Sequence, residues 1–296
     1  MIPAFLENAL ALDLIPVPKQ DISSDKFTRW GKNDCFWAKA VCNGFIYGDF
    51  SKAVSKSVFP QAPEHLSRAF VEMRRKAVEQ ERLEARRQQE CYWAKCAQRA
   101  QKIWNGAKPV QTHPYLTRKK IKGSGLKITV SRSLIIPLRD VNGKIWTLEY
   151  ITEQGKKFMM KSGLKKGRFY MFGKPAKRLF LCEGYATAES VYSVVKECTV
   201  CCVDAGNLKE VASELRRKYP EIEMIFCADN DKYGMFNTGR EKAAQAAKSV
   251  KGRVVYPFFK TTQEATYPTD FNDLLCLDGA AAVHHQLFKI WGITHG

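Results

Sequence analysis

The sequence lacks any apolar run of about 18 residues, the length that a membrane-spanning helix requires, so we expect no membrane association. Its first residues, Met1–Asn8, carry no basic group ahead of the apolar ones, and we therefore expect no secretory signal. The five histidines do not lie at zinc-finger spacing from the ten cysteines, which predicts that there is no structural zinc. Several cysteines stand in apolar runs, which is typical of reduced, buried thiols and indicates a cytoplasmic protein.

Acidic residues are almost missing from one part of the chain. Residues 101–178 hold 19 Lys and Arg but only three Asp and Glu, whereas residues 1–100 hold 16 and 12 and residues 179–296 hold 13 and 15. Nearly all of the formal net charge of +18 therefore lies in the middle segment. A one-sided basic segment is typical of a surface that binds a polyanion, and it predicts a nucleic-acid partner. A basic face kept for solubility, the alternative, would usually carry interspersed acids.

The 296 residues, 45% of them hydrophobic, suffice for one large domain or two smaller ones. Residues 1–60 are rich in aromatic side chains and predict a small module, in which a core is a simpler interpretation than stacking on bases. Residues 61–105 have no Pro or Gly after Pro63 and predict a long charged helix. Residues 106–178 predict a basic subdomain of strands, with a hairpin turn at Asp140–Gly143.

Residues 179–296 alternate short apolar runs with helical patterns. The apolar runs are residues 179–182, 199–203, 224–228 and 253–257. This alternation predicts an α/β domain, a parallel sheet with helices on both faces. The expected architecture is thus this domain preceded by a basic α+β subdomain, a long helix and a small N-terminal module.

Acidic side chains follow three of these apolar runs. Glu183, Asp204 and Asp229 come at or just after the strand ends, and Asp231 lies two residues beyond Asp229. Because the carboxyl ends of parallel strands meet at one edge of a sheet, we expect these side chains to converge there. Carboxylates are the ligands that Mg²⁺ prefers, and the segment Asp270–Asp273 could add further oxygen ligands. The alternative is that an acid after a strand caps the next helix, which could explain Asp204 or Glu183 singly.

The acidic motifs occur in an order that resembles a known family. Glu183-Gly184 after one strand and Asp229-x-Asp231 after another look like the Toprim domain of bacterial primases, topoisomerases and some nucleases. The full set is similar to the Toprim domains of plasmid and prophage primases and comprises Cys182–Ala188, Asp204–Leu208, Ala228–Asp231 and Asp270–Leu274. Upstream, the basic subdomain also resembles the one that precedes Toprim in those primases, at His113–Leu116, Pro137–Asp140 and Gly155–Phe158. The resemblance covers roughly residues 106–280.

The resemblance implies a DNA primase that joins ribonucleotides on a single-stranded DNA template with Mg²⁺ or Mn²⁺. Carried over to this sequence, Asp229 and Asp231 would hold the metal, and Glu183 would be a metal ligand or the general base. The residues with an implied supporting role are Asp204, Asn207, Asp270 and Asp273. Those expected to bind template or nucleoside triphosphate are Arg139, Lys157, Lys161, Lys165, Lys166 and Arg168.

Two features depart from the family pattern. Bacterial primases usually begin with a zinc-binding module, and the matching Cys and His spacing is not found here. The sequence also has no G-x-x-x-x-G-K-[ST] loop of a fused helicase, so we expect a separate replicative helicase or another replication protein as a partner. Two other functions stay open at this point: a Toprim nuclease or strand-cleaving enzyme, and a non-catalytic nucleic-acid-binding accessory factor.

Overall fold

The computed structural model describes residues 2–52, 54–60, 68–231, 238–260 and 266–292. The chain forms two compact units, residues 1–95 (unit 1) and residues 96–296 (unit 2). Helix α2 (Arg68–Gly106) contributes residues to both units, and its predicted start at Pro63 lies outside the described residues. In the described part of the chain, no helix is both long and apolar enough to cross a membrane.

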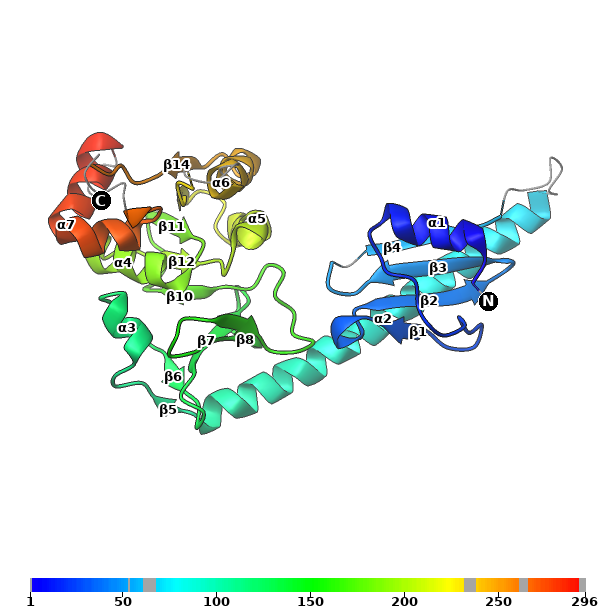
Figure 1. The fold of residues 1–296 in the computed structure, drawn as a ribbon. Helices are drawn as coiled ribbons and strands as arrows, with labels where there is room; N and C mark the ends of the chain where they lie inside the picture. The colour runs from blue at the N-terminus through cyan, green and yellow to red at the C-terminus, as the bar shows by residue number, and fades with distance from the viewer. Residues whose placement is uncertain (1, 53, 61–67, 232–237, 261–265, 293–296) are drawn as a thin grey trace. The chain divides into compact units, whose positions relative to one another are not determined.

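Unit 1 is an antiparallel sheet in the order β1-β2-β3-β4, with α1 on one face and the first part of α2 on the other (Figure 1). The strands and helices that form it before α2 are α1 (Ala4–Leu12), β1 (Thr28–Trp30), η1 (Lys32–Asp34), β2 (Phe36–Val41), β3 (Gly44–Asp49) and β4 (Val54–Val58). Side chains alternate between the faces along β2, so that Ala38 packs towards α1 whereas Trp37 and Val41 pack towards α2.

The aromatic side chains of unit 1 serve as its core. The Trp37 ring lies 5.2 Å from the Phe27 ring and 5.5 Å from the Phe50 ring, measured between centroids. Lys39, on the same face of β2, is 7% exposed, and its ammonium donates to both carboxylate oxygens of Glu81 on α2 at 2.9 and 2.8 Å. Apolar packing holds α2 against the sheet, and this half-buried ion pair adds a specific contact between them.

Unit 2 contains two sheets. The first is antiparallel, in the order β5-β6-β7-β8-β9, and one of its faces packs on the last turns of α2 through residues such as Cys96 and Ala100. Its elements are β5 (Lys108–Pro109), α3 (Pro114–Arg118), β6 (Lys127–Ile128), β7 (Leu134–Arg139), β8 (Ile145–Ile151) and β9 (Lys157–Met159). The hairpin predicted at Asp140–Gly143 joins β7 to β8, where Asp140 accepts hydrogen bonds from the Asn142 and Lys144 backbone N–H groups.

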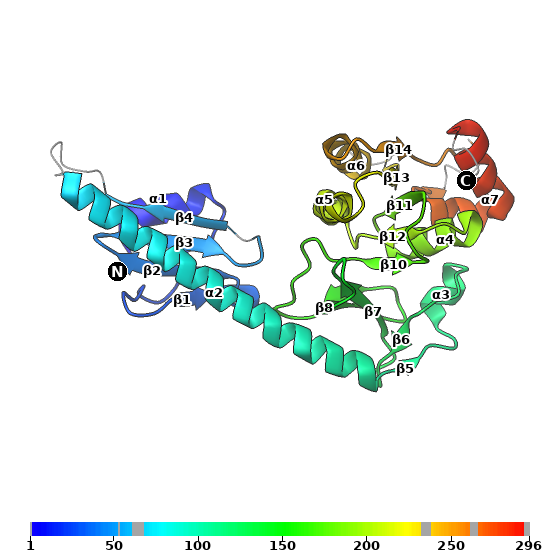
Figure 2. The same cartoon turned by 180° about the vertical axis from the view of Figure 1, so that it is seen from behind.

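The second sheet has the order β10-β12-β11-β13-β14. Its elements are β10 (Tyr170–Phe172), β11 (Arg178–Cys182), α4 (Tyr185–Val195), β12 (Thr199–Cys201), η2 (Ala205–Asn207), α5 (Leu208–Lys218), β13 (Glu223–Cys227), α6 (Thr238–Ser249), β14 (Arg253–Val255), α7 (Phe271–His285) and η4 (Gln286–Ile290). Helices α4 and α7 cover one face and α5 and α6 the other, which Figure 2 shows from behind. The predicted parallel α/β domain with helices on both faces is confirmed for β11 to β14.

One strand differs from the prediction. Residues 170–172, expected in the basic subdomain, form β10, which pairs antiparallel with β12 at the edge of the second sheet. Phe172 packs in a core cluster that also contains Leu134 and Ile136 of β7 and Phe180 of β11. The two sheets of unit 2 therefore share one core, because the basic segment supplies both a strand and apolar side chains to it.

A buried carboxylate on α4 also connects the two parts of unit 2. Glu189 is 3% exposed and accepts hydrogen bonds from the Gly123 N–H at 2.9 Å and from the Ser124 N–H and Oγ at 2.9 and 2.6 Å. These donors lie in the loop between α3 and β6. The loop is thereby attached to α4 by three charge-assisted bonds.

We expect Glu189→Ala to lower the free energy of unfolding by about 2 kcal/mol, because it leaves the buried Gly123 N–H and two partly buried Ser124 donors without their acceptor. Urea denaturation followed by circular dichroism measures this change. Glu7→Ala, at an exposed position on α1, is the matched control and should change stability by less than about 0.5 kcal/mol. Equal effects of the two substitutions would contradict the assigned role of Glu189.

Candidate active site

The acidic edge of the second sheet follows from the register of its parallel strands. Cys182 at the end of β11 is aligned with Cys201 of β12 and with Cys227 of β13. The chain therefore leaves all three strands at the same edge. Glu183 follows β11 directly, whereas Asp229 follows β13 after one intervening residue.

Carboxylates from two of these strand ends meet at Gly239, near the start of α6. The point that a Cβ atom on Gly239 would occupy lies 2.9 Å from Glu183 Oε1 and 3.1 Å from Asp231 Oδ2. It also lies 3.2 Å from the backbone oxygen of Asp229. Any side chain at residue 239 would push into this cluster, so glycine leaves the carboxylates the space that they occupy. The structure thus brings together the predicted residues Glu183, Asp229 and Asp231.

Burial makes this cluster electrostatically costly. Glu183 Oε1 and Asp229 Oδ1 are buried without a hydrogen-bond partner in the described part of the chain. Burial raises the pKa of Glu183 to about 7, and the charges of Asp231 and Asp204 add to the shift. Burial also raises the pKa of Asp229 well above its usual value, with the charge of Asp270 as the next cause. The site would thus be stabilised by a positive charge placed among these oxygens.

A divalent cation fits this requirement by the chemistry of the donors. The two unpartnered oxygens are hard carboxylate ligands, and Asp231 supplies a third carboxylate at the same point. Across the described ranges, no group of three or more Asp, Glu, His or Cys side chains is placed as a set that could hold a metal ion without rearrangement. Glu183, Asp229 and Asp231 are the residues that would hold the ion, with water and substrate oxygens completing its shell.

Asp204 and Asn207 organise the neighbouring turn. Asp204 Oδ1 accepts from the Asn207 N–H at 3.1 Å and so caps η2, while its Oδ2 accepts from Lys165 Nζ at 2.6 Å. The capping interpretation is therefore correct for Asp204. Asn207 is 2% exposed; its Nδ2 donates to the backbone oxygens of Arg168 and Cys202 and its Oδ1 accepts from the Gly167 N–H. This side chain attaches the basic loop before β10 to the end of β12.

Asp270 and Asp273 form a capping box at the start of α7. Asp270 Oδ1 accepts from the Asp273 N–H at 2.8 Å, and Asp273 Oδ2 accepts from the Asp270 N–H at 3.4 Å. Lys119 Nζ lies 3.4 Å from Asp273 Oδ1. Asn272, between the two acids, is fully buried and donates to the Lys119 backbone oxygen and to Ser190 Oγ. The motif thus positions α7 beside the carboxylate cluster.

The predicted basic residues divide into two groups. Lys157 Nζ lies 3.4 Å from the point that a Cβ on Gly184 would occupy, next to Glu183, and Lys165 binds Asp204. Lys166 forms an ion pair with Glu210 on α5 at 3.2 Å. The other basic residues, Arg139, Lys161 and Arg168, are placed differently: the Arg139 and Arg168 guanidinium groups lie over the rings of Trp104 and Trp146, at 5.9 and 5.1 Å, and Lys161 is on an exposed turn.

Sequence reasoning missed three residues at the acidic edge. Glu149 of β8 is 4% exposed; burial raises its pKa to about 7, against the attraction of Lys157. Lys242 of α6 lies close enough to Glu183 to favour its charged form. Glu149 had a detectable signal, a single acid within an otherwise apolar strand, but Gly239 and Lys242 had none, because a helix start with scattered charges is an ordinary pattern.

The chain contains one C-x-x-C pair, Cys198 and Cys201, which the zinc prediction did not consider. The two thiols are buried in different core clusters, one on each face of the second sheet. They therefore do not face one another as a pair of metal ligands would.

We expect Mn²⁺ to raise the melting temperature of the wild-type chain by about 5 °C at saturating concentration, because it neutralises repelling buried carboxylates. Glu183→Gln should lose most of this shift, whereas Glu221→Gln, at an exposed position in the same unit, should keep it. Differential scanning fluorimetry with and without EDTA measures both. If Mn²⁺ raised the melting temperature of Glu183→Gln as much as that of wild type, Glu183 would not be a ligand of the ion.

Glu149 predicts a pH-dependent stability. Its pKa is about 7 in the folded chain and near 4.5 in the unfolded chain, so the stability present below about pH 4.5 is lost as the pH rises through 7. Since glutamine does not ionise, Glu149→Gln should gain about 2 to 3 kcal/mol over wild type near pH 8 and much less near pH 5. Denaturant unfolding at both pH values tests this, with Glu221→Gln as a control that should show no such difference. A constant gain would mean that Glu149 is already ionised in the folded chain.

Comparisons with known proteins identify the domain to which this edge belongs. Residues 178–281 match the family model of the Toprim domain. The DNA primase TraC of Escherichia coli is 38% identical over 171 residues, and a second E. coli DNA primase TraC is 33% identical over 198 residues. These matches cover 54% and 63% of this chain but only 12% and 18% of the relatives.

Among solved structures, the primase fragment of the bacteriophage T7 primase-helicase protein gives a TM-score of 0.45 at 15% identity and covers 62% of this chain and 80% of that one. The DnaG primase catalytic domain bound to ssDNA gives a TM-score of 0.45 at 13% identity, covering 68% and 79%. Similarity at this level does not bear on function. The family match and the sequence identity do establish that residues 178–281 are a Toprim domain and that the chain is homologous to the DNA primase TraC of E. coli.

Proposed function

We propose that the chain is the catalytic part of a DNA primase, which synthesises short RNA primers on single-stranded DNA during plasmid or phage replication. The observation that carries the proposal is the cluster of Glu183, Asp229 and Asp231 beside basic side chains, in a chain homologous to primases. Nucleotidyl transfer consists mainly of positioning and charge neutralisation, so this combination supplies what the reaction needs.

Glu183, Asp229 and Asp231 would hold Mg²⁺ or Mn²⁺, and the ion would neutralise charge that develops on the phosphate oxygens. The alternative role for Glu183 is that of general base: its pKa, raised to about 7 in the metal-free chain, suits it to accept the proton of the attacking 3′-hydroxyl if Asp229 and Asp231 alone hold the ion. Asp204, Asn207, Asp270 and Asp273 support the site indirectly, by holding the basic loop and α7 in place.

Lys157 is the residue best placed for the nucleoside triphosphate. Its ammonium lies beside Gly184, which caps α4, so a phosphate there would meet both the lysine and the free N–H groups of the helix start. Lys165 and Lys166 are held at the same edge by Asp204 and Glu210 and could exchange these partners for template phosphates. The remaining basic residues, Arg139, Lys161 and Arg168, would contact the template farther from the metal.

The partners of the proposed reaction are a single-stranded DNA template, ribonucleoside triphosphates and a separate helicase or other replication protein in the cytoplasm of a bacterium.

We expect the chain to form short RNA from labelled ribonucleotides on single-stranded DNA with Mg²⁺ or Mn²⁺. Asp229→Asn/Asp231→Asn should reduce the product by about 100-fold or more, because it removes two of the three proposed metal ligands. Asp21→Asn/Asp25→Asn in unit 1 is the matched control and should keep activity. Product length and yield on a denaturing gel are the measurements.

RNA synthesis by the Asp229→Asn/Asp231→Asn variant at the wild-type level would contradict the active-site assignment. Nicking of the DNA without RNA synthesis would favour a Toprim nuclease. Neither activity, with salt-sensitive DNA binding retained, would favour an accessory factor.

A further inference from the structure

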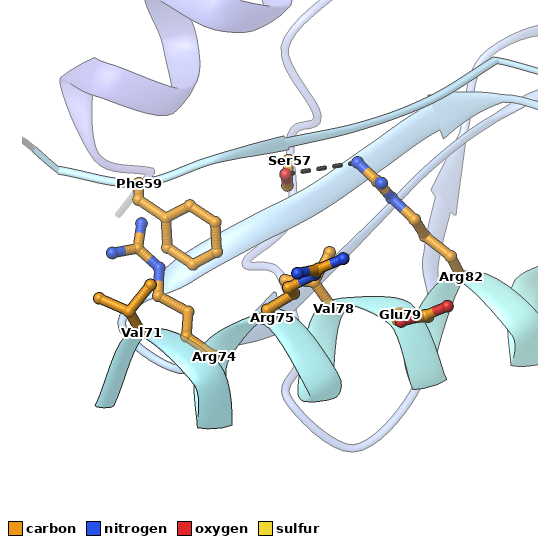
Figure 3. A pocket seen from close by; sticks show the side chains of 8 residues that line it. All are labelled: Ser57, Phe59, Val71, Arg74, Arg75, Val78, Glu79 and Arg82. Atoms are coloured by element: carbon orange, nitrogen blue, oxygen red, sulfur yellow. Dashed lines mark hydrogen bonds between the residues drawn. The ribbon is translucent and has the colours of Figure 1, made fainter. Parts of the chain in front are cut away.

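Unit 1 contains a groove that the proposed catalytic reaction does not use. It lies between edge strand β4 and the first turns of α2 and encloses about 600 Å³ (Figure 3). Its lining residues are Ser57, Phe59, Val71, Arg74, Arg75, Val78, Glu79 and Arg82. Apolar side chains thus alternate with three arginines along a single shallow depression.

Two of the arginines are held in defined positions. The Arg74 guanidinium lies over the Phe59 ring, 3.2 Å from its centroid, and Arg82 Nη2 donates to Ser57 Oγ at 3.4 Å (Figure 3). Stacking on an aromatic ring orients the plane of a guanidinium while leaving its N–H groups able to donate. Arg75 lies between them along the helix.

The groove arginines differ from other cations of the same helix. Lys76 and Arg86 form ion pairs with Glu72 and Glu90, four residues away. Within the described ranges, no carboxylate lies at ion-pair distance from the three groove arginines, and Glu79 is the one acid in the lining. The groove therefore carries an excess positive charge that an anionic ligand would neutralise.

We propose that this groove binds single-stranded nucleic acid. The guanidinium forks of Arg75 and Arg82 match phosphate oxygens, and the stacked Arg74 and Phe59 pair offers a flat surface to an unpaired base. The apolar floor of Val71 and Val78 favours a strand with exposed bases over a duplex, whose bases are stacked inside. The site lies outside the Toprim domain, and its existence does not depend on primer synthesis.

The test measures binding of the full chain to a labelled oligothymidylate by fluorescence anisotropy, without nucleotides or divalent metal, over a series of salt concentrations. Arg75→Ala/Arg82→Ala should weaken binding about 10-fold and reduce the slope of log K against log salt by about 1.4, since each single-strand phosphate contact contributes about 0.7. Arg86→Ala/Arg87→Ala, which removes two exposed cations of the same helix, is the matched control and should change both values less. Arg75→Lys/Arg82→Lys keeps both charges but lacks the guanidinium forks, so it should keep the salt slope and bind more weakly than wild type. This result would show that the alanine variant loses phosphate contacts and is not simply unfolded.

Equal losses in the two alanine variants would overturn the proposal, because general charge would then explain the binding. If Arg75→Ala/Arg82→Ala bound oligothymidylate as wild type does but no longer bound a poly-glutamate peptide, the nucleic-acid proposal would be rejected in favour of an acidic protein partner. If Arg75→Ala/Arg82→Ala lost more affinity for blunt duplex DNA than for the single strand, the proposed contact with exposed bases would be contradicted. An oligouridylate arm distinguishes RNA from DNA as the strand bound.

Discussion

The carboxylates of Glu183, Asp229 and Asp231 repel one another at one buried edge of the parallel sheet. The other elements of unit 2 hold these carboxylates in place and put positive charges near them. The register of β11 and β13 brings Glu183 and Asp229 to the same edge, and Gly239 places no side chain between the carboxylates of Glu183 and Asp231. Glu183 and Asp229 each keep a buried oxygen without a hydrogen-bond partner in the described residues. Such an arrangement lowers stability, and proteins retain it where the charges serve binding or catalysis.

The surrounding elements offset part of this cost. Lys157 and Lys242 act electrostatically on the cluster, and Asp204 and Asp273 each accept from a lysine while capping a helix. Asn207 holds the basic loop to the end of β12, and the first sheet shares its core with the second. The basic segment and the acidic edge are therefore parts of one folded unit. Packing of the shared core, and not a flexible linker, holds the basic side chains close to the carboxylates.

Much of this arrangement is predictable from the residues. Apolar runs that alternate with helices identify parallel strands, and strand ends identify the edge at which Glu183, Asp229 and Asp231 meet. β10 was not predictable, because three residues have too little pattern to show which sheet they pair with. Nor did the sequence separate Lys157 from Lys161: Lys157 begins β9 and Lys161 follows it by two residues, but only Lys157 lies beside Gly184. The roles assigned to these residues stay predictions.

The long helix illustrates the same limit in unit 1. Its acids and bases balance in the sequence only up to Arg86, which predicted a charged helix and little else. In the folded chain, Arg74, Arg75 and Arg82 line the groove, whereas Arg86 forms an ion pair with Glu90. The sequence by itself determined the α/β class, the acids at the strand ends and the basic segment, because periodicity and charge are local properties of the chain. Which cations face the acids, which face a groove and which are already paired was decided only by the tertiary structure, because those distances depend on packing between residues far apart in the chain.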